Sequence, residues 1–182
     1  MKMKEVKYAA LFGGSGKNRE SKEYKETLLI GSFLAEKGYA VKNGGYGGMM
    51  EAVSKGITDE GGKAVGVTCK QVGPEKGNDF LTETIVTETL YQRLEILIDN
   101  TDLFIVQKGG IGTLSEVFLT LDIIRKESKV NRPKIFLIGD FWNEIINSLK
   151  LNIIPECEHD LFTVLSDYEE LKRIISRTGK SS

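Results

Sequence analysis

The chain has 182 residues, of which 40% are apolar and 28% charged, so we expect one globular domain, residues 1–182, with a substantial core. Its 25 basic and 26 acidic residues leave a net charge of −1, which argues against the basic surface of a nucleic-acid-binding protein. Neither a membrane-spanning apolar run nor a signal peptide is recognisable, so we expect a cytoplasmic protein without a membrane partner. Cys69, Cys157 and the single histidine, His159, lack metal-ligand spacing and predict no metal site or Ser-His-Asp triad.

The first predicted unit is a strand, a glycine loop and a helix. Residues 8–12 form an apolar strand candidate, and Gly13-Gly14-Ser15-Gly16 follows it directly. Apolar residues then recur at helical spacing up to Gly38. This order is typical of the start of a βαβ unit that binds a ligand through its glycine loop. The loop lacks the full GxGxxG spacing and the Walker A lysine, so a simple tight turn is the alternative.

A second glycine loop follows the next predicted strand, residues 39–42. It reads Asn43-Gly44-Gly45-Tyr46-Gly47-Gly48 and leads into a helix that begins near Met49. Residues 64–68 and 83–87 are the third and fourth strand candidates, separated by a polar loop over 69–80. The helix after residue 87 carries Arg93 beside its apolar stripe, either extended along the surface or partly buried against an anion or a carboxylate.

The third glycine loop belongs to the longest stretch of the chain that has the pattern of a ligand-binding loop. The apolar strand candidate 102–106 leads into Gln107-Lys108-Gly109-Gly110-Ile111-Gly112-Thr113-Leu114-Ser115-Glu116, and a helical pattern continues to about residue 126. Glycines allow the backbone to approach an oxygen-rich ligand, and the first N–H groups of a helix bind anions. The alternative is a plain helix start, in which Thr113 caps the helix and Glu116 closes a capping box.

The fold class follows from the alternation of these elements with two more strand candidates, residues 133–139 and 161–165, and a last helix capped by Asp167. We predict a Rossmann-like, doubly wound parallel sheet of about seven strands with helices on both faces. The three glycine loops should gather at the carboxyl edge of that sheet and hold a ligand of nucleotide size. Leu119 and Ile123 form a second apolar face on the helix after the third loop, which predicts a homodimer.

The motifs resemble those of the Lonely Guy family. Lys108 to Glu116 is similar to the family's PGGxGTxxE motif, and Gly44-Gly45-Tyr46-Gly47-Gly48-Met49-Met50 is similar to its second glycine motif. The resemblance covers residues 8 to 146, and relatives often carry the label "possible lysine decarboxylase", although no pyridoxal-binding lysine is recognisable. The departures are Lys108 for proline, Leu94 for a basic residue and Asn43 for glycine. The stretch after Met50 is closer to molybdenum-cofactor carrier proteins.

The resemblance implies roles for named residues. It makes Arg93 and Glu116 the catalytic pair of a phosphoribohydrolase, an enzyme that cuts nucleoside 5′-monophosphates into base and ribose 5-phosphate without metal or cofactor. It implies a phosphate and nucleotide site made by the three glycine loops: Gly13, Gly14, Ser15, Gly44, Gly45, Gly48, Met49, Lys108, Gly109, Gly110, Gly112 and Thr113. The carrier branch implies the second hypothesis, a protein that binds a phosphorylated cofactor or nucleotide without cleaving it. The added cation of Lys108 slightly favours this second hypothesis.

Overall fold

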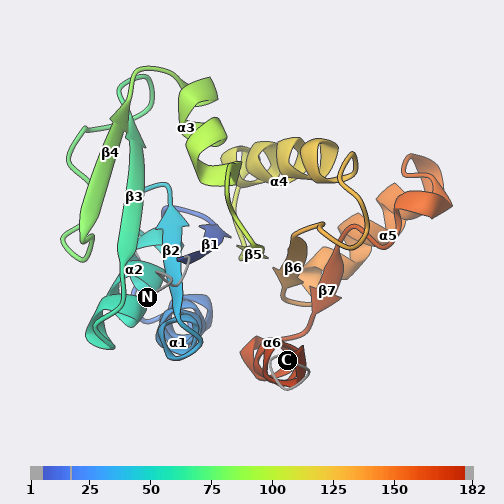
Figure 1. Cartoon of the computed structure of the whole chain (residues 1–182), viewed down its shortest axis with the longest axis horizontal. Helices are drawn as coiled ribbons and strands as arrows, with labels where there is room; N and C mark the ends of the chain where they lie inside the picture. Colours follow the sequence, from blue (N-terminus) through green and yellow to red (C-terminus); the bar gives the residue numbers. More distant parts are fainter. Residues whose placement is uncertain (1–5, 17, 179–182) are drawn as a thin grey trace, which may run out of the picture.

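The computed structural model describes residues 6–16 and 18–178. It contains one sheet of seven parallel strands in the order β4-β3-β2-β1-β5-β6-β7 (Figure 1). The strands are β1 (Lys7–Phe12), β2 (Tyr39–Asn43), β3 (Ala64–Cys69), β4 (Glu83–Thr87), β5 (Leu103–Val106), β6 (Lys134–Ile138) and β7 (Thr163–Leu165). The helices are α1 (Lys22–Glu36), α2 (Met49–Asp59), α3 (Leu90–Ile98), α4 (Ile111–Ile124), α5 (Phe141–Asn152), α6 (Tyr168–Thr178) and the short 3-10 helix η1 (Glu156–Glu158).

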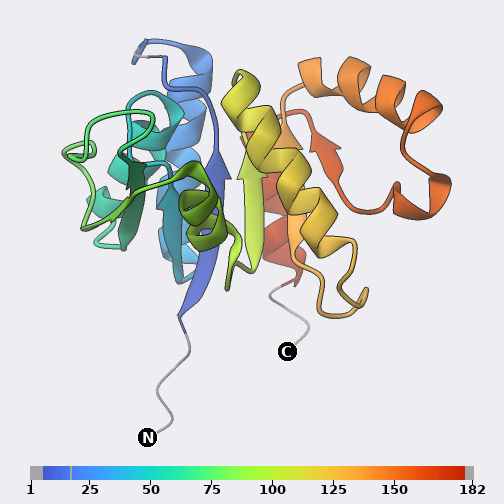
Figure 2. The same cartoon turned by 90° about the horizontal axis from the view of Figure 1, so that it is seen from above.

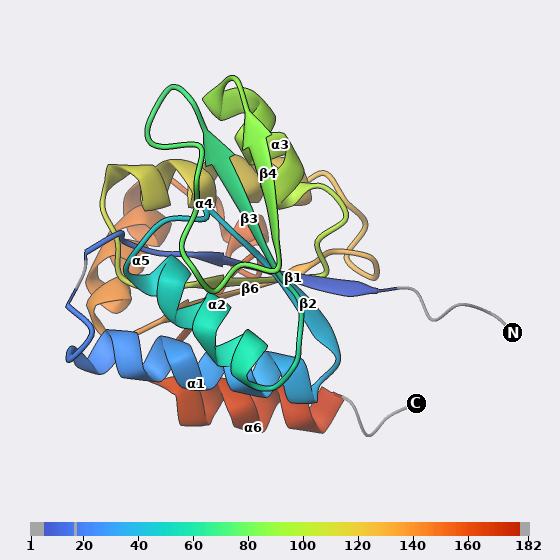
Figure 3. The same cartoon turned by 90° about the vertical axis from the view of Figure 1, so that its left-hand side faces the viewer.

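Helices cover both faces of the sheet, as the sequence predicted. One core cluster joins the strands to α1, α2 and α6, and the other joins them to α3, α4 and α5. Figure 3 shows α1 and α6 side by side on one face, with α3 and α4 on the opposite face. In β1, Ala9 and Leu11 belong to the first cluster and Ala10 and Phe12 to the second. This burial on both faces explains why the central strands read as continuous apolar runs.

The connection between the third and fourth strands is a loop, as the sequence predicted. β3 and β4 pair directly in parallel without a helix between them, which interrupts the alternation of strands and helices at this one point. Residues 70–82 make this connection, and their polar loop passes back along the sheet to the start of β4. Leu81, partly buried against the first core cluster, anchors the end of the loop. Part of this loop lies against the second glycine loop, because the Asn78 N–H donates to the Gly45 carbonyl at 2.7 Å.

The order of the strands creates a crevice between β1 and β5. The chain moves outwards from β1 to β4, returns to pair β5 with the other side of β1, and continues to β7. Figure 2 shows the arrows of β1 and β5 pointing to the same edge, where α4 begins. The loops after β1 and β5 lead to helices on opposite faces, so they separate at this edge. Such a switch point is where open parallel sheets bind their ligands.

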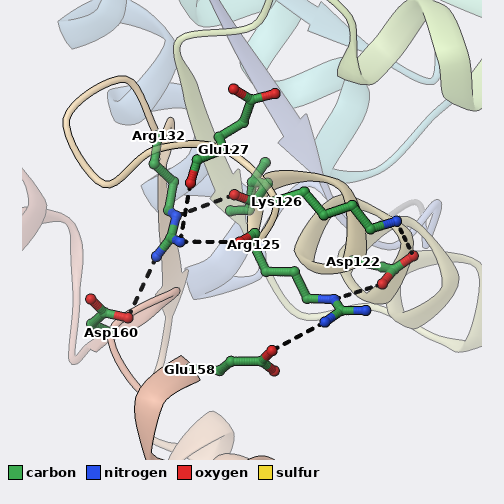
Figure 4. Close-up of polar contacts among 8 residues, drawn as sticks. Asp122, Arg125, Lys126, Glu127, Arg132, Glu158 and Asp160 are labelled. Atoms are coloured by element: carbon green, nitrogen blue, oxygen red, sulfur yellow. Dashed lines mark hydrogen bonds and ion pairs between the residues drawn. The ribbon is translucent and has the colours of Figure 1, made fainter.

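The far end of α4 is held by Arg132. Its guanidinium donates to the carbonyl oxygens of Ile124, Arg125 and Glu127 at 3.2 to 3.3 Å, and it lies 3.5 Å from Asp160 (Figure 4). These carbonyls belong to the last turn of the helix and its exit, where backbone acceptors lack partners within the helix. Arg125 adds a second link by pairing with Asp122 and Glu158. α4 is therefore tied to the segment before β7 at the end remote from the crevice.

Candidate active site

A cleft of about 370 Å³ opens at the carboxyl edge of β1 and β5. Residues from the three glycine loops, α2, the β3–β4 loop, α3 and α4 line it: Gly13, Gly14, Ser15, Tyr46, Met50, Val72, Leu90, Arg93, Gly110, Gly112, Thr113 and Glu116. Eight of these twelve were predicted as site residues, and their gathering around one cavity agrees with the expected convergence of the loops. The cleft is large enough for a nucleotide-sized ligand.

The amino end of α4 forms one wall of the cleft. The helix starts at Ile111, with Gly110 as its N-cap and no side chain capping it. The first N–H that bonds within the helix belongs to Leu114, which donates to the Gly110 carbonyl at 3.1 Å. The N–H groups of residues 111–113 therefore precede the first intrahelical bond, and Gly112 and Thr113 line the cleft. This arrangement is suited to binding an anion.

The alternative interpretation of the third glycine loop, a capping box at Thr113, is not found. The helix begins two residues earlier than Thr113, so Thr113 lies inside the first turn and Glu116 lies in the second. Glu116 is then too far along the helix to reach the N-cap N–H. Its carboxylate instead faces Arg93, with Oε1 3.5 Å from an Nη nitrogen of the guanidinium.

Arg93 and Glu116 form a buried pair at the inner end of the cleft. Both residues are 8% exposed. Arg93 is positioned by its Nε, which donates to the Val67 carbonyl at 2.9 Å, and by the Tyr46 ring, whose centroid lies 5.7 Å from Cζ. Burial raises the pKa of Glu116 to about 7, although the positive charge of Arg93 partly opposes the shift. A carboxyl group with this pKa exchanges a proton readily near neutral pH.

Several predicted ligand residues support the site from behind and do not line the cleft. A side chain at Gly44 would overlap the Arg93 guanidinium and the Met50 sulfur, so this glycine leaves room for the arginine. Gly48 has a φ of 65° and packs against the loop after β1. The Met49 N–H donates to the Gly14 carbonyl at 3.0 Å, which joins the first two loops.

Three more predicted ligand residues, Gly45, Lys108 and Gly109, also do not line the cleft. Gly45 has a φ of 81°, and its N–H donates to the Asn43 side chain at 2.8 Å. Gly109 approaches Gly14 and Thr113 so closely that a side chain would overlap the threonine hydroxyl. Lys108 is exposed, and its ammonium lies 5.5 Å from the centroid of the Phe141 ring, so it is not among the residues lining the cleft.

Sequence reasoning missed four residues of the cleft. Tyr46 and Met50 lie within the second glycine motif, and their neighbours Gly45 and Met49 were chosen in their place. Val72 comes from the β3–β4 loop, which carried no local signal of function. Leu90 belongs to the apolar stripe of α3, and the pattern alone assigned it to the core.

The described residues contain no cluster of three or more metal-ligating side chains. Among the helices of residues 6–16 and 18–178, none combines the length and apolar character needed to cross a membrane.

Comparison with known proteins places this geometry in a family context. A cytokinin riboside 5′-monophosphate phosphoribohydrolase from Mycobacterium tuberculosis is 40% identical over 91 residues, which are 49% of this chain and 49% of that protein. The chain therefore spans about half the length of this curated relative.

Two solved structures share the fold across nearly the whole chain. A structural genomics target, TM1055, has a TM-score of 0.76 at 27% identity and covers 94% of this chain and 99% of its own. The molybdenum cofactor binding protein of Rippkaea orientalis has a TM-score of 0.75 at 22% identity, covering 97% of this chain and 99% of its own.

The model of the SLOG cluster4 family (LDcluster4) matches residues 7–138, a span that contains all the residues of the cleft. The chain therefore belongs to the SLOG cluster4 family, with relatives among the Lonely Guy phosphoribohydrolases and structural neighbours among the molybdenum cofactor carriers.

Proposed function

We propose that this protein is a nucleoside 5′-monophosphate phosphoribohydrolase, which hydrolyses the N-glycosidic bond to release free base and ribose 5-phosphate. The observation that carries the proposal is the buried Arg93–Glu116 pair, which lines the same cleft as the amino end of α4. One wall of that cleft is suited to a phosphate, and its inner end offers a carboxyl group to the sugar. The relative named as a phosphoribohydrolase supports the same reaction class.

In the proposed complex the 5′-phosphate lies at the N–H groups of residues 111–113. The positive end of the α4 dipole, about half an elementary charge, favours an anion there. Thr113 lines the cleft and offers its side-chain hydroxyl as a further donor. Holding the phosphate orients the ribose towards Glu116 and removes much of the entropic cost of reaching the transition state.

Glu116 then acts on the anomeric carbon. The bond between C1′ and the base nitrogen breaks, the electron pair leaves with the base, and positive charge develops on the ribosyl ring. The ionised carboxylate stabilises that charge and accepts a proton from the attacking water, whose oxygen bonds to C1′. The departing base takes up one proton and Glu116 releases the one it accepted from water, so the products are neutral base and ribose 5-phosphate and the carboxylate is ionised again. Arg93 holds Glu116 in place and favours its ionised form.

The second candidate is a protein that binds a phosphorylated cofactor or nucleotide without cleaving it. The candidate is suggested by the Rippkaea orientalis molybdenum cofactor binding protein, which shares the fold at 22% identity. Binding needs the amino end of α4 but no working carboxyl group. The cation of Lys108, which the sequence suggested as an aid to anion binding, lies over Phe141 and outside the cleft lining.

The deciding experiment incubates the protein with AMP and other nucleoside monophosphates and separates the products by chromatography. We expect free base from wild type, and a loss of at least about a hundredfold in turnover for Glu116→Gln with nearly unchanged phosphate affinity. Arg93→Ala should also lower turnover. Ser115→Ala, an exposed neighbour on α4, is the matched control and should turn over normally. Turnover retained by Glu116→Gln contradicts the catalytic role, and tight binding without base release from wild type supports the carrier.

A further inference from the structure

A chain of hydrogen bonds connects the third glycine loop to two helices outside the cleft. Gln107, which directly follows β5 and begins that loop, is 1% exposed, and its Nε2 donates to Oε2 of Glu26 on α1 at 3.1 Å. Oε1 of the same carboxylate accepts from the N–H of Tyr168, the first residue of α6, at 2.8 Å. Glu26 therefore links the start of the loop to α1 and α6, which lie side by side in Figure 3.

Glu26 and Gln107 lie outside the lining of the cleft, so their influence on a ligand there is indirect. Gln107 leads directly into Lys108, whose carbonyl accepts a hydrogen bond from the Gly14 N–H at 2.9 Å and so joins the third loop to the first. Two residues later Gly110 caps α4, where the N–H groups proposed to bind phosphate begin. The position of Gln107 therefore affects where these N–H groups point.

Lys108 leaves the start of the loop with less intrinsic stiffness than the motif that it resembles. A proline at that position would fix the backbone φ at about −65°, whereas lysine does not restrict it in this way. Hydrogen bonds replace that covalent restraint: the Gln107 N–H donates to the Phe12 carbonyl at 2.8 Å, and the Gln107 side chain is held by Glu26. Because a buried amide group is costly unless it is hydrogen-bonded, the Glu26 carboxylate favours one orientation of the Gln107 side chain.

We propose that Glu26 and Gln107 are positioning residues that hold the third glycine loop in the form that binds phosphate. Glu26 fixes the Gln107 side chain, Gln107 fixes the start of the loop, and the amino end of α4 is thereby ordered before the ligand arrives. A site ordered in advance binds more tightly, because binding no longer incurs the entropic cost of ordering it. This inference rests on the proposed function, because it places the 5′-phosphate at α4, but it does not depend on hydrolysis.

The test measures the affinity of the protein for ribose 5-phosphate by calorimetry. Gln107→Leu, which keeps a buried side chain of similar size without the amide, should bind about tenfold more weakly than wild type, the loss typical of one hydrogen bond to a charged group. Glu26→Ala should show a similar loss. The double variant should lose no more than Gln107→Leu alone, because Glu26 acts on the loop through Gln107.

Two control variants separate positioning from stability. Glu26→Gln can keep both contacts and should bind like wild type, since its amide oxygen accepts from the Tyr168 N–H and its NH₂ group donates to the Gln107 amide oxygen. Asp167→Ala removes another support of α6, the acceptor for the Glu170 N–H at 3.0 Å, and leaves the Glu26–Gln107 contact in place. It should lower the melting temperature and leave the affinity for ribose 5-phosphate unchanged.

The outcomes are distinct from those that test hydrolysis. Wild-type affinity in Gln107→Leu or Glu26→Ala, an equal loss in Asp167→Ala, or additive losses in the double variant would overturn the positioning role even if AMP is cleaved. Weaker binding in Gln107→Leu and Glu26→Ala, with no base release from wild type, upholds the positioning role and overturns the hydrolase. If wild type does not bind ribose 5-phosphate, both proposals are wrong. The comparison of Glu26→Ala with Glu26→Gln decides the question even if Gln107→Leu does not fold.

Discussion

At the scale of single residues, Glu116 carries opposing effects. Burial disfavours its charged form, and the resulting pKa of about 7 makes it useful for proton transfer near neutrality. Arg93 compensates only in part, because the two groups are separated by 3.5 Å and not joined by a short bidentate contact. A site of this kind reduces stability in exchange for reactivity.

The stability of the protein should therefore depend on Glu116 in a defined pH range. Its folded pKa of about 7 exceeds the ordinary value of 4.5, so the folded state binds more protons between those values. The contribution of Glu116 to the free energy of unfolding must then fall as pH rises from about 4.5 to 7. Glu116→Gln lacks this titration. Its free energy of unfolding, relative to that of wild type, should therefore increase by up to about 3 kcal/mol between pH 5 and pH 8. Urea unfolding of both proteins at each pH checks this, and parallel pH profiles would contradict it.

Gly44 should be intolerant of a side chain. A methyl group there would overlap the Arg93 guanidinium and the Met50 sulfur. Gly44→Ala should therefore displace Arg93, lower base release and cost about 1–3 kcal/mol of stability through overpacking. Gly16→Ala is the matched control, because a side chain at Gly16 meets nothing within 4 Å. Thermal unfolding and the base-release assay measure both variants, and equal behaviour of the two would refute the role given to Gly44.

At the scale of elements, α4 joins the site to the rest of the domain. Its amino end lines the cleft and carries Glu116, and its carboxyl end is held by Arg132. The sequence located this helix correctly but not its first residue. The Thr113–Glu116 pattern is a stronger local signal of a helix start than Gly110-Ile111, yet the helix begins at Ile111, directly after Gly109 packs closely against Gly14.

Removing the Arg132 side chain should loosen the carboxyl end of α4. Arg132→Ala leaves the Ile124, Arg125 and Glu127 carbonyls without this donor and should cost about 1–2 kcal/mol of stability. Lys129→Ala removes an exposed ion pair to the same Asp160 and should cost less than about 1 kcal/mol. Chemical denaturation compares the two, and equal losses would show that Arg132 acts only as a surface charge.

At the scale of the whole molecule, an apolar surface remains on α4. Leu119 and Ile123 are 37% and 39% exposed, one helical turn apart on the side away from the core. The sequence predicted that this face is a subunit interface, and the prediction stands for test. A second copy packed on α4 would lie close to the cleft, because α3 and α4 both contribute residues to its lining.

We expect a homodimer in solution at micromolar concentration. The double variant Leu119→Glu with Ile123→Glu should convert it to monomer, because charges would be buried without partners at the interface. Leu151→Glu on α5, where the side chain is 84% exposed, is the control and should stay dimeric. Multi-angle light scattering measures all three proteins, and a monomeric wild type would contradict the prediction.

The sequence by itself determined the strands and helices, and it placed the glycine loops at the carboxyl edge of the sheet. Apolar runs such as that of β1 and glycine loops such as that after β5 are local signals, because strand burial and turn geometry depend on neighbours along the chain. The tertiary structure alone decided which side chains meet. The pairing of Arg93 with Glu116, the space left by Gly44 and the entry of Val72 into the cleft all join segments brought together by the crossovers of a parallel sheet. No local pattern records such contacts, because they depend on strand order and register.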